Sequence, residues 1–260
     1  MLLQLQNVSG GYGKGDIVKN VSCEADEGDI LCLAGPNGCG KTTLFRLIIG
    51  SIPLSGGRIL IDGQDHLKLS PRELANRIAY IPQYHSPVFS YTVLDVVLMG
   101  LNSRLPLLAQ PSAAQRQAAR DLLRQVGMDG REEQDFLTLS EGQKQLVILA
   151  RALMQDTPVL LLDEPDSALD LANRNHMAAL LAEFVHASGK TALICLHDPM
   201  LMLDWCDTLI VLQNGQVGAM LYPRTDPVEA LQSALAAVYG PLELVPVTDR
   251  TGRVRLALLP

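Results

Sequence analysis

Long apolar runs are absent from this sequence of 260 residues. A helix that crosses a bilayer needs about 20 consecutive apolar residues, whereas the apolar run at residues 159–162 ends at two carboxylates, Asp163 and Glu164. Residues 1–7 also lack the basic segment and the long apolar segment of a secretory signal. We therefore expect no membrane-spanning helix and no export, so that any membrane association depends on a partner.

The sequence also has no excess of positive charge and no closely paired cysteines. It carries 21 Lys and Arg against 28 Asp and Glu, a net charge of −7, whereas binding to nucleic acid relies on clustered cations. The five cysteines include no C-x-x-C pair, and an odd number cannot pair completely within one chain. We therefore expect a protein with reduced thiols in the cytosol, and no nucleic acid partner.

The sequence does contain a regular alternation of apolar strands and helices. Near the start, polar and apolar residues alternate in short runs typical of strands. Further predicted strands are residues 29–34, 77–82, 159–162, 191–196 and 208–213, and the predicted helices are residues 43–49, 142–154 and 171–187. This alternation predicts an α/β fold with a mainly parallel sheet that helices cover on both faces.

Residues 91 to about 130 have helical periodicity instead. Val93, Val96, Val97 and Leu101 fall on one helical face, and residues 113–126 are rich in Ala, Gln and Arg with apolar residues at helical spacing. We interpret this stretch as an inserted helical lobe. After Pro223 the pattern predicts a helix at residues 228–238 and short strands within residues 242–259.

A glycine-rich loop follows the strand at residues 29–34. It matches the pattern G-x-x-x-x-G-K-[ST] between a strand and a helix, which is the context in which this pattern binds phosphate. The loop N–H groups and the amino end of the helix are expected to contact phosphate oxygens. Lys41 is expected to reach the β- and γ-phosphates, and the Thr42 hydroxyl to bind Mg²⁺. The nucleotide-binding residues predicted here are Gly35, Pro36, Asn37, Gly38, Cys39, Gly40, Lys41, Thr42 and Thr43.

Two adjacent carboxylates follow the strand at residues 159–162. Open α/β sheets bind ligands at the carboxyl ends of their strands. Side chains alternate along a strand, so Asp163 and Glu164 are expected to have different roles. We predict that Asp163 serves Mg²⁺, directly or through water, and that Glu164 is the general base for the water that attacks the γ-phosphate.

Taken together, these motifs resemble those of the nucleotide-binding subunits of ABC transporters, from Leu3 to about Leu221. The signature motif of that family is matched by Leu139-Ser140-Glu141-Gly142-Gln143, and its D-loop by Ser167-Ala168-Leu169-Asp170. His197 resembles the switch histidine, Gln83 the Q-loop glutamine, and Tyr12 the aromatic residue that stacks on adenine. The order and spacing of the motifs make the resemblance specific.

The resemblance implies one ABC ATPase domain over residues 1–260, with the P-loop NTPase fold. Residues 1–86 and 131–222 would form a RecA-like core with an N-terminal antiparallel β subdomain. Residues 87–130 would form a helical subdomain that extends into the signature helix to about residue 154, and residues 223–260 a C-terminal tail. It also implies a homodimer, with ATP and Mg²⁺ bound between the two subunits.

In that dimer, ATP held by the Lys41 loop of one subunit would be completed by the signature motif of the other. The resemblance adds Ser140, Gly142, Gln143 and Asp170 to the nucleotide-binding residues. Catalysis would depend on Lys41, Gln83, Glu164 and His197, and Mg²⁺ on Thr42, Gln83 and Asp163.

One position departs from the family pattern. Glu141 stands where the signature usually has its first glycine, and a carboxylate beside a triphosphate would repel it unless the side chain points away. We expect ATP binding to persist. The hydrolysis rate stays open, which leaves as an alternative a regulatory cassette that binds ATP but hydrolyses it poorly. Cys39 also stands where serine is common, at a position that contributes mainly backbone.

A single cassette without a fused membrane domain favours an importer assembled from separate subunits. Residues 89–100 and the segment Val238-Tyr239-Gly240 resemble the subgroup that imports iron–siderophore complexes, haem and cobalamin. The implied partners are a permease dimer in the inner membrane, which holds the chain at its cytoplasmic face as a peripheral subunit, and a substrate-binding protein outside. A groove near Gln83 would receive the permease, with Val88 and Ser90 beside it.

Two alternatives stay open. One is a molybdate or tungstate importer of the same architecture, since the ATPase does not contact the cargo. The other is a soluble ABC ATPase that acts on nucleic acid or ribosomes, which would need a basic surface that the acidic composition does not supply.

Overall fold

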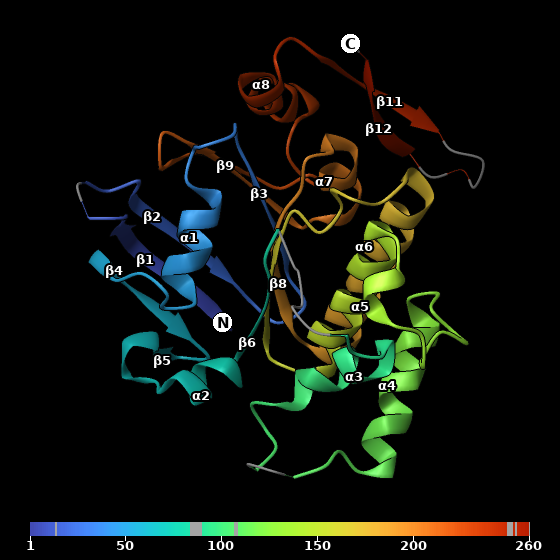
Figure 1. The fold of residues 1–260 in the computed structure, drawn as a ribbon. Helices are drawn as coiled ribbons and strands as arrows, with labels where there is room; N and C mark the ends of the chain where they lie inside the picture. Colours follow the sequence, from blue (N-terminus) through green and yellow to red (C-terminus); the bar gives the residue numbers. More distant parts are fainter. Residues whose placement is uncertain (14, 84–89, 107–108, 249–251, 253, 260) are drawn as a thin grey trace.

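The computed structural model describes residues 1–13, 15–83, 90–106, 109–248, 252 and 254–259 (Figure 1). Its centre is a six-stranded sheet in the order β10-β9-β3-β8-β7-β6. The strands are β10 (Gln216–Leu221), β9 (Thr208–Gln213), β3 (Ile30–Ala34), β8 (Thr191–Cys195), β7 (Val159–Asp163) and β6 (Ile78–Ile81). Neighbours run parallel except β10, which is antiparallel to β9. The expected, mainly parallel sheet is thus confirmed.

The three middle strands β3, β8 and β7 are buried at every residue. A parallel sheet is covered on both faces, so its strands are apolar throughout instead of alternating. In β3, Leu31 and Leu33 pack on one face, and Ile30 and Cys32 pack on the other. Burial on both faces fixes the positions of the strand ends, where the polar residues of the site begin.

One face of this sheet packs on α1 (Lys41–Ile48), which lies between it and a second sheet. The second sheet has the order β2-β1-β4-β5 and is antiparallel, as expected for the N-terminal part. Its strands are β1 (Leu3–Gly10), β2 (Val18–Ala25), β4 (Leu54–Ile61) and β5 (Gln64–Asp65), followed by η1 (His66–Lys68) and α2 (Pro71–Ala75). Figure 1 shows α1 on the same side of the parallel strands as β1 and β2.

Five further helices lie on the opposite side of the sheet and share one hydrophobic core with it (Figure 1). They are α3 (Val93–Leu98), α4 (Ala113–Gln125), α5 (Glu141–Met154), α6 (Leu171–Ser188) and α7 (Pro199–Trp205), with short 3₁₀ turns η2 (Met99–Leu101) and η3 (Phe136–Thr138). The helices predicted at residues 113–126, 142–154 and 171–187 are confirmed to within about one residue. The proposed subdomain boundary between residues 86 and 87 lies outside the described residues, as do Val88 and Phe89.

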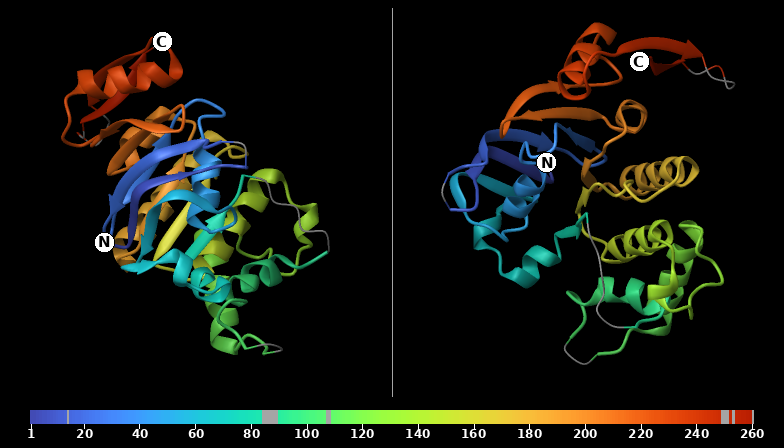
Figure 2. Two further views of the ribbon diagram at one scale, coloured as in Figure 1. Left: turned by 90° about the vertical axis from the view of Figure 1, so that its left-hand side faces the viewer. Right: turned by 45° about the horizontal axis from the view of Figure 1, so that its top comes forward.

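The tail consists of α8 (Val228–Tyr239) and a hairpin of β11 (Glu243–Thr248) and β12 (Val254–Leu259). Leu231, Leu235 and Leu244 are buried and join the main hydrophobic core. Arg255 of the hairpin forms an ion pair of 2.9 Å with Asp204 of α7. Figure 2 places the tail at the opposite end of the molecule from α3 and α4. The helix and strands predicted after Pro223 are confirmed, and they cover one end of the core.

Within the described residues, none of the helices has the length and apolar character that crossing a bilayer requires.

Candidate functional site

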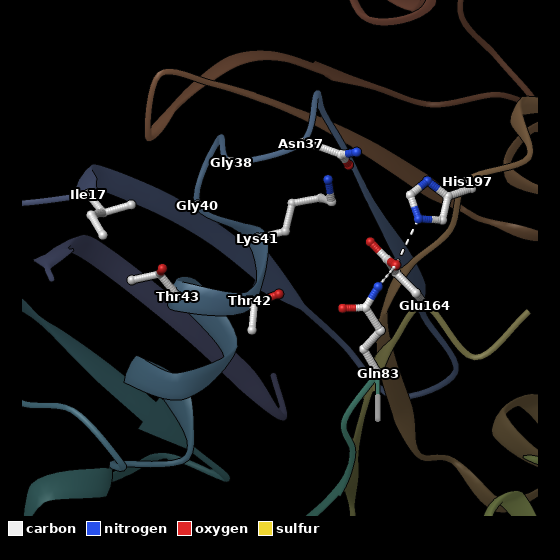
Figure 3. A pocket seen from close by; sticks show the side chains of 10 residues that line it. All are labelled: Ile17, Asn37, Gly38, Gly40, Lys41, Thr42, Thr43, Gln83, Glu164 and His197. Carbon is white, nitrogen blue, oxygen red and sulfur yellow. Dashed lines mark hydrogen bonds and ion pairs between the residues drawn. The ribbon is translucent and has the colours of Figure 1, made fainter. Parts of the chain in front are cut away.

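A pocket of about 470 Å³ opens at the carboxyl ends of the parallel strands (Figure 3). Its walls come from three parts of the chain that are far apart in sequence: the loop before α1, the end of β6, and the segments that follow β7 and β8. The lining residues are Ile17, Asn37, Gly38, Gly40, Lys41, Thr42, Thr43, Gln83, Glu164 and His197. Nine of these ten were predicted from the sequence, so the pocket brings together half of the 18 residues expected at the site.

The glycines of the loop between β3 and α1 are needed for its path. Gly35 has φ 156°, and a Cβ there would lie 2.4 Å from the Leu212 carbonyl oxygen. Gly40 is the N-cap of α1 with φ 111° and has no side chain to cap the helix. The first N–H groups of a helix have no intrahelical acceptor, so they are available here to an anion in the pocket. Gly35, Pro36 and Cys39 belong to this loop but do not line the pocket. Burial raises the pKa of the Cys39 thiol.

Lys41 is 7% exposed, and its side chain folds back over its own loop. Its Nζ donates to the carbonyl oxygens of Gly35, at 2.8 Å, and Pro36, at 3.3 Å. Figure 3 shows the ammonium group between the loop and Glu164. Among the described residues its hydrogen-bond acceptors are these two neutral carbonyls, so the buried ammonium is positioned to bind an anion.

Asp163 and Glu164 differ in environment, as expected. The alternation of side chains along a strand is one cause, and the backbone conformation of Glu164 is another. Asp163 is the last residue of β7, whereas Glu164 adopts the left-handed conformation at φ 53°. The N–H of Glu164 still donates to the Cys195 carbonyl oxygen of β8, at 3.1 Å. This turn directs the Glu164 carboxylate into the pocket and leaves the Asp163 carboxylate buried behind it.

Gln83 and His197 meet the carboxylate of Glu164 at a single oxygen. Nε2 of His197 lies 2.8 Å from Oε2 of Glu164, and the Gln83 side-chain amide donates to the same oxygen. Both contacts are visible in Figure 3. The three residues follow β6, β7 and β8, which are neighbours in the sheet. Parallel strands end at the same edge of a sheet, so residues 81 positions apart come into contact.

The donor set fits Mg²⁺. Both carboxylate oxygens of Asp163 are buried, and neither has a hydrogen-bond partner among the described residues. Burial raises the pKa of Asp163, while the nearby Thr42 hydroxyl and Lys41 ammonium act in the opposite direction. A buried carboxylate without a partner is costly, and a divalent cation with oxygen ligands would satisfy it. Thr42 and Gln83 present further oxygens in the same pocket.

Tyr12 is not among the residues that line the pocket. It is 52% exposed, its hydroxyl accepts from Arg46 at 2.8 Å, and the Arg46 guanidinium lies 5.7 Å from its ring centroid. The apolar wall of the pocket comes from Ile17, which sequence reasoning missed. A Cβ on Gly40 would lie 3.4 Å from Cγ2 of Ile17. The sequence offered one signal for Ile17: it lies directly before the strand β2 and five residues after Tyr12.

Ser140, Gly142, Gln143 and Asp170 also lie outside the pocket. Ser140 is the N-cap of α5, where its hydroxyl accepts from the Gln143 N–H and the Gln143 side chain accepts from the Ser140 N–H. Asp170 caps α6 by accepting from the Asn173 N–H at 2.8 Å. None of these four residues lines the Lys41 pocket of the same chain, and we refer to the three at the amino end of α5 as the second surface.

Asp166 is a further buried residue that sequence reasoning missed. It is 1% exposed, and burial raises its pKa, while the backbone N–H groups of Asp166 itself and of His197 oppose this effect. Its position two residues after Glu164, in a stretch already rich in acidic residues, was the available signal.

The fold and the pocket together are those of a P-loop NTPase. The family model described as ABC transporter matches residues 18–167, which is more than half of the chain. A Helicobacter pylori protein named "Probable iron chelatin transport ATP-binding protein" is 35% identical over 247 residues, which cover 94% of this chain and 96% of the relative. The hemin import ATP-binding protein of Shewanella denitrificans is 34% identical over 221 residues, 83% of this chain and 85% of the relative.

Solved structures give the same result. A structure described as an inward-facing metal-chelate type ABC transporter has a TM-score of 0.84 at 27% identity and covers 100% of this chain and 96% of its own. A dimeric post-hydrolysis ATP-binding cassette with ADP and phosphate has a TM-score of 0.76 at 26% identity and covers 86% of this chain and all of its own. The chain belongs to the ABC transporter family, as its ATP-binding, ATP-hydrolysing component.

Proposed function

We propose that this chain is the ATPase subunit of a multi-subunit importer that takes up an iron–siderophore complex, haem or a cobalamin-type compound. The observation that carries the proposal is the likeness to a metal-chelate type transporter, which covers 100% of the chain, tail included, at a TM-score of 0.84. The names of the Helicobacter and Shewanella relatives support the same class of cargo.

In this proposal, the pocket residues bind ATP and activate water. The Lys41 ammonium leaves its two carbonyl acceptors to contact the β- and γ-phosphates, and the loop N–H groups hold the phosphate oxygens. Glu164 takes a proton from the attacking water, and His197 holds the water and the γ-phosphate. Thr42, Asp163 and Gln83 hold Mg²⁺, which neutralises phosphate charge when bound.

The second surface, at α5, serves the ATP of another copy of the chain. Ser140, Gly142 and Gln143 lie at the amino end of a 14-residue helix, whose dipole and free N–H groups favour a phosphate. Two copies arranged head to tail would therefore enclose two ATP molecules and separate after hydrolysis. The dimer would work on a permease dimer at the cytoplasmic face of the membrane, with a substrate-binding protein on the other side.

Uptake in cells tests this proposal. Cells that lack the gene are supplied with labelled iron chelates, haem, cobalamin and molybdate, and are complemented either with the native gene or with the Lys41→Ala variant. We expect uptake of one iron chelate, haem or cobalamin to be lost in the deletion strain. The native gene should restore it, and the Lys41→Ala gene should not.

If only molybdate uptake were lost, the chain would still be an importer ATPase, but its cargo would be molybdate and not an iron chelate, haem or cobalamin. Unchanged uptake of every compound would contradict the proposed function.

A further inference from the structure

We propose that Lys144 is a positioning residue of the composite ATP site, because it neutralises Glu141 and so allows the signature helix to accept the ATP of a second copy. This inference rests on the proposed function, in which two copies enclose ATP. It assigns a role to a pair of residues that the site described above does not use.

The observation is an ion pair on the first turn of α5. Lys144 Nζ lies 2.7 Å from Oε1 of Glu141, three residues apart on the helix. The Glu141 side chain is 73% exposed and the Lys144 side chain 21%. Within the described residues, Lys144 is the cation that pairs with Glu141. Ser140 and Gln143 cap each other, so neither of them offsets the carboxylate charge.

The packing of this turn explains why a side chain is tolerated at position 141 and not at position 142. A Cβ on Gly142 would lie 3.1 Å from the Ala168 carbonyl oxygen and 3.5 Å from Cδ2 of Leu169. Position 142 therefore has little room for a side chain. Position 141 faces solvent, and its carboxylate is drawn along the helix toward Lys144, away from the amino end where a phosphate would bind.

Whether the amino end of α5 repels a triphosphate depends on Lys144. A carboxylate in the first turn of a helix interacts favourably with the helix dipole, so Glu141 suits the free subunit. The same carboxylate repels a triphosphate placed at that helix end. With Lys144 in place, the pair carries no net charge toward the nucleotide. Without Lys144, the helix end presents one uncompensated negative charge.

The test compares ATP dependence in variants of the full-length chain. Lys144→Gln is expected to raise the ATP concentration for half-maximal hydrolysis by about three- to tenfold and to leave the maximal rate within about twofold, because the repulsion acts on assembly around ATP. Lys144→Arg should behave like the native chain. The double variant Glu141→Gln with Lys144→Gln should recover the native ATP dependence, since no charge is left to neutralise.

A matched control exists on α4, where Arg124 pairs with Asp121 at the same spacing of three residues and at 3.0 Å. Arg124→Gln should leave the ATP dependence unchanged. As a second readout, each substitution is combined with Glu164→Gln, and the ATP concentration that produces dimers is measured by light scattering. Lys144→Gln should raise that concentration by a similar factor.

Equal ATP dependence of Lys144→Gln and Arg124→Gln would overturn the inference. A double variant that stays as weak as Lys144→Gln would also overturn it, because Lys144 would then contact the nucleotide itself. If the native chain neither hydrolyses ATP nor dimerises with it, the proposed function fails as well, which the native control reveals before any variant is compared.

Discussion

Nε2 of His197 lies 2.8 Å from Oε2 of Glu164, on the oxygen to which Gln83 also donates. Two hydrogen-bonding groups therefore converge on one oxygen of the proposed base. The His197 side chain is 47% exposed, whereas the Glu164 side chain is 11% exposed, so the histidine forms the solvent-facing side of the pair.

Because the two residues share one oxygen, their substitutions should not be additive. Glu164→Gln is expected to lower ATP turnover by about 10²- to 10⁴-fold, the usual contribution of a general base, with ATP binding retained. His197→Ala should lower turnover less, and the double variant should be no slower than Glu164→Gln alone. Steady-state ATPase assays and nucleotide binding measure this. Equal turnover of the native and Glu164→Gln chains would show that Glu164 is not the base.

In the absence of Mg²⁺, the buried carboxylate of Asp163 should lower the stability of the folded chain. Its buried carboxylate has no hydrogen-bond partner among the described residues, so Asp163→Asn removes a desolvated charge. We expect the variant to unfold about 2–4 °C higher than the native chain without metal and nucleotide, and to lose Mg²⁺-dependent hydrolysis. Calorimetry and ATPase assays are the measurements. A lower unfolding temperature would indicate that the native carboxylate is satisfied by water or another group.

Gly142 is expected to be sensitive even to alanine. The added Cβ would press on the Ala168 carbonyl oxygen at 3.1 Å and displace the D-loop by a few tenths of an ångström. The free energy of unfolding should change by less than about 1 kcal/mol, because alanine favours a helix by about that amount and offsets the contact. Turnover should fall about tenfold, because small displacements in a site are costly. Native turnover in Gly142→Ala would show that the D-loop adapts without loss.

Asp156 connects the segment after η2 to the end of α6. Lys190 Nζ lies 2.7 Å from Oδ1 of Asp156, and Arg104 lies 3.2 Å from Oδ2. Burial would raise the pKa of Asp156, but Lys190 and Arg104 outweigh it, so the pKa lies below the ordinary value of 3.8. A lowered pKa means that the stabilisation is present above the unfolded value and is lost as the pH falls through the folded value.

Asp156→Asn should therefore lower the free energy of unfolding by up to about 1 kcal/mol at neutral pH, since the pair is partly exposed and screened. The difference from the native chain should be the same at about pH 5 as at about pH 7, and should shrink below about pH 4. Urea titrations across this range measure it. A difference that is already smaller at about pH 5 would contradict the lowered pKa.

Much of the site could be predicted because its parts are local. The loop from Gly35 to Thr42 carries its own information, since glycines at fixed spacing allow the backbone turn and the flanking strand and helix have their own apolar patterns. The capping box of Ser140 and Gln143 is likewise encoded within one turn. The roles of these residues remain predictions that the experiments above can test.

Other features depended on contacts between distant segments. The left-handed conformation of Glu164 at φ 53° is held in the folded chain beside Cys195 of β8, and no pattern around Glu164 indicates it. Tyr12 contacts Arg46, 34 residues away, and does not line the pocket. Ile17 lines the pocket because it directly precedes β2 and lies beside Gly40.

The sequence by itself determined the class of fold and the order of the motifs, because apolar periodicity and glycine spacing act over a few residues. Only the tertiary structure decided that Gln83 and His197 share one oxygen of Glu164. That contact requires β6, β7 and β8 to be neighbours in one parallel sheet. Strand order is set by burial and hydrogen bonding between segments far apart in the chain, and local sequence patterns do not contain it.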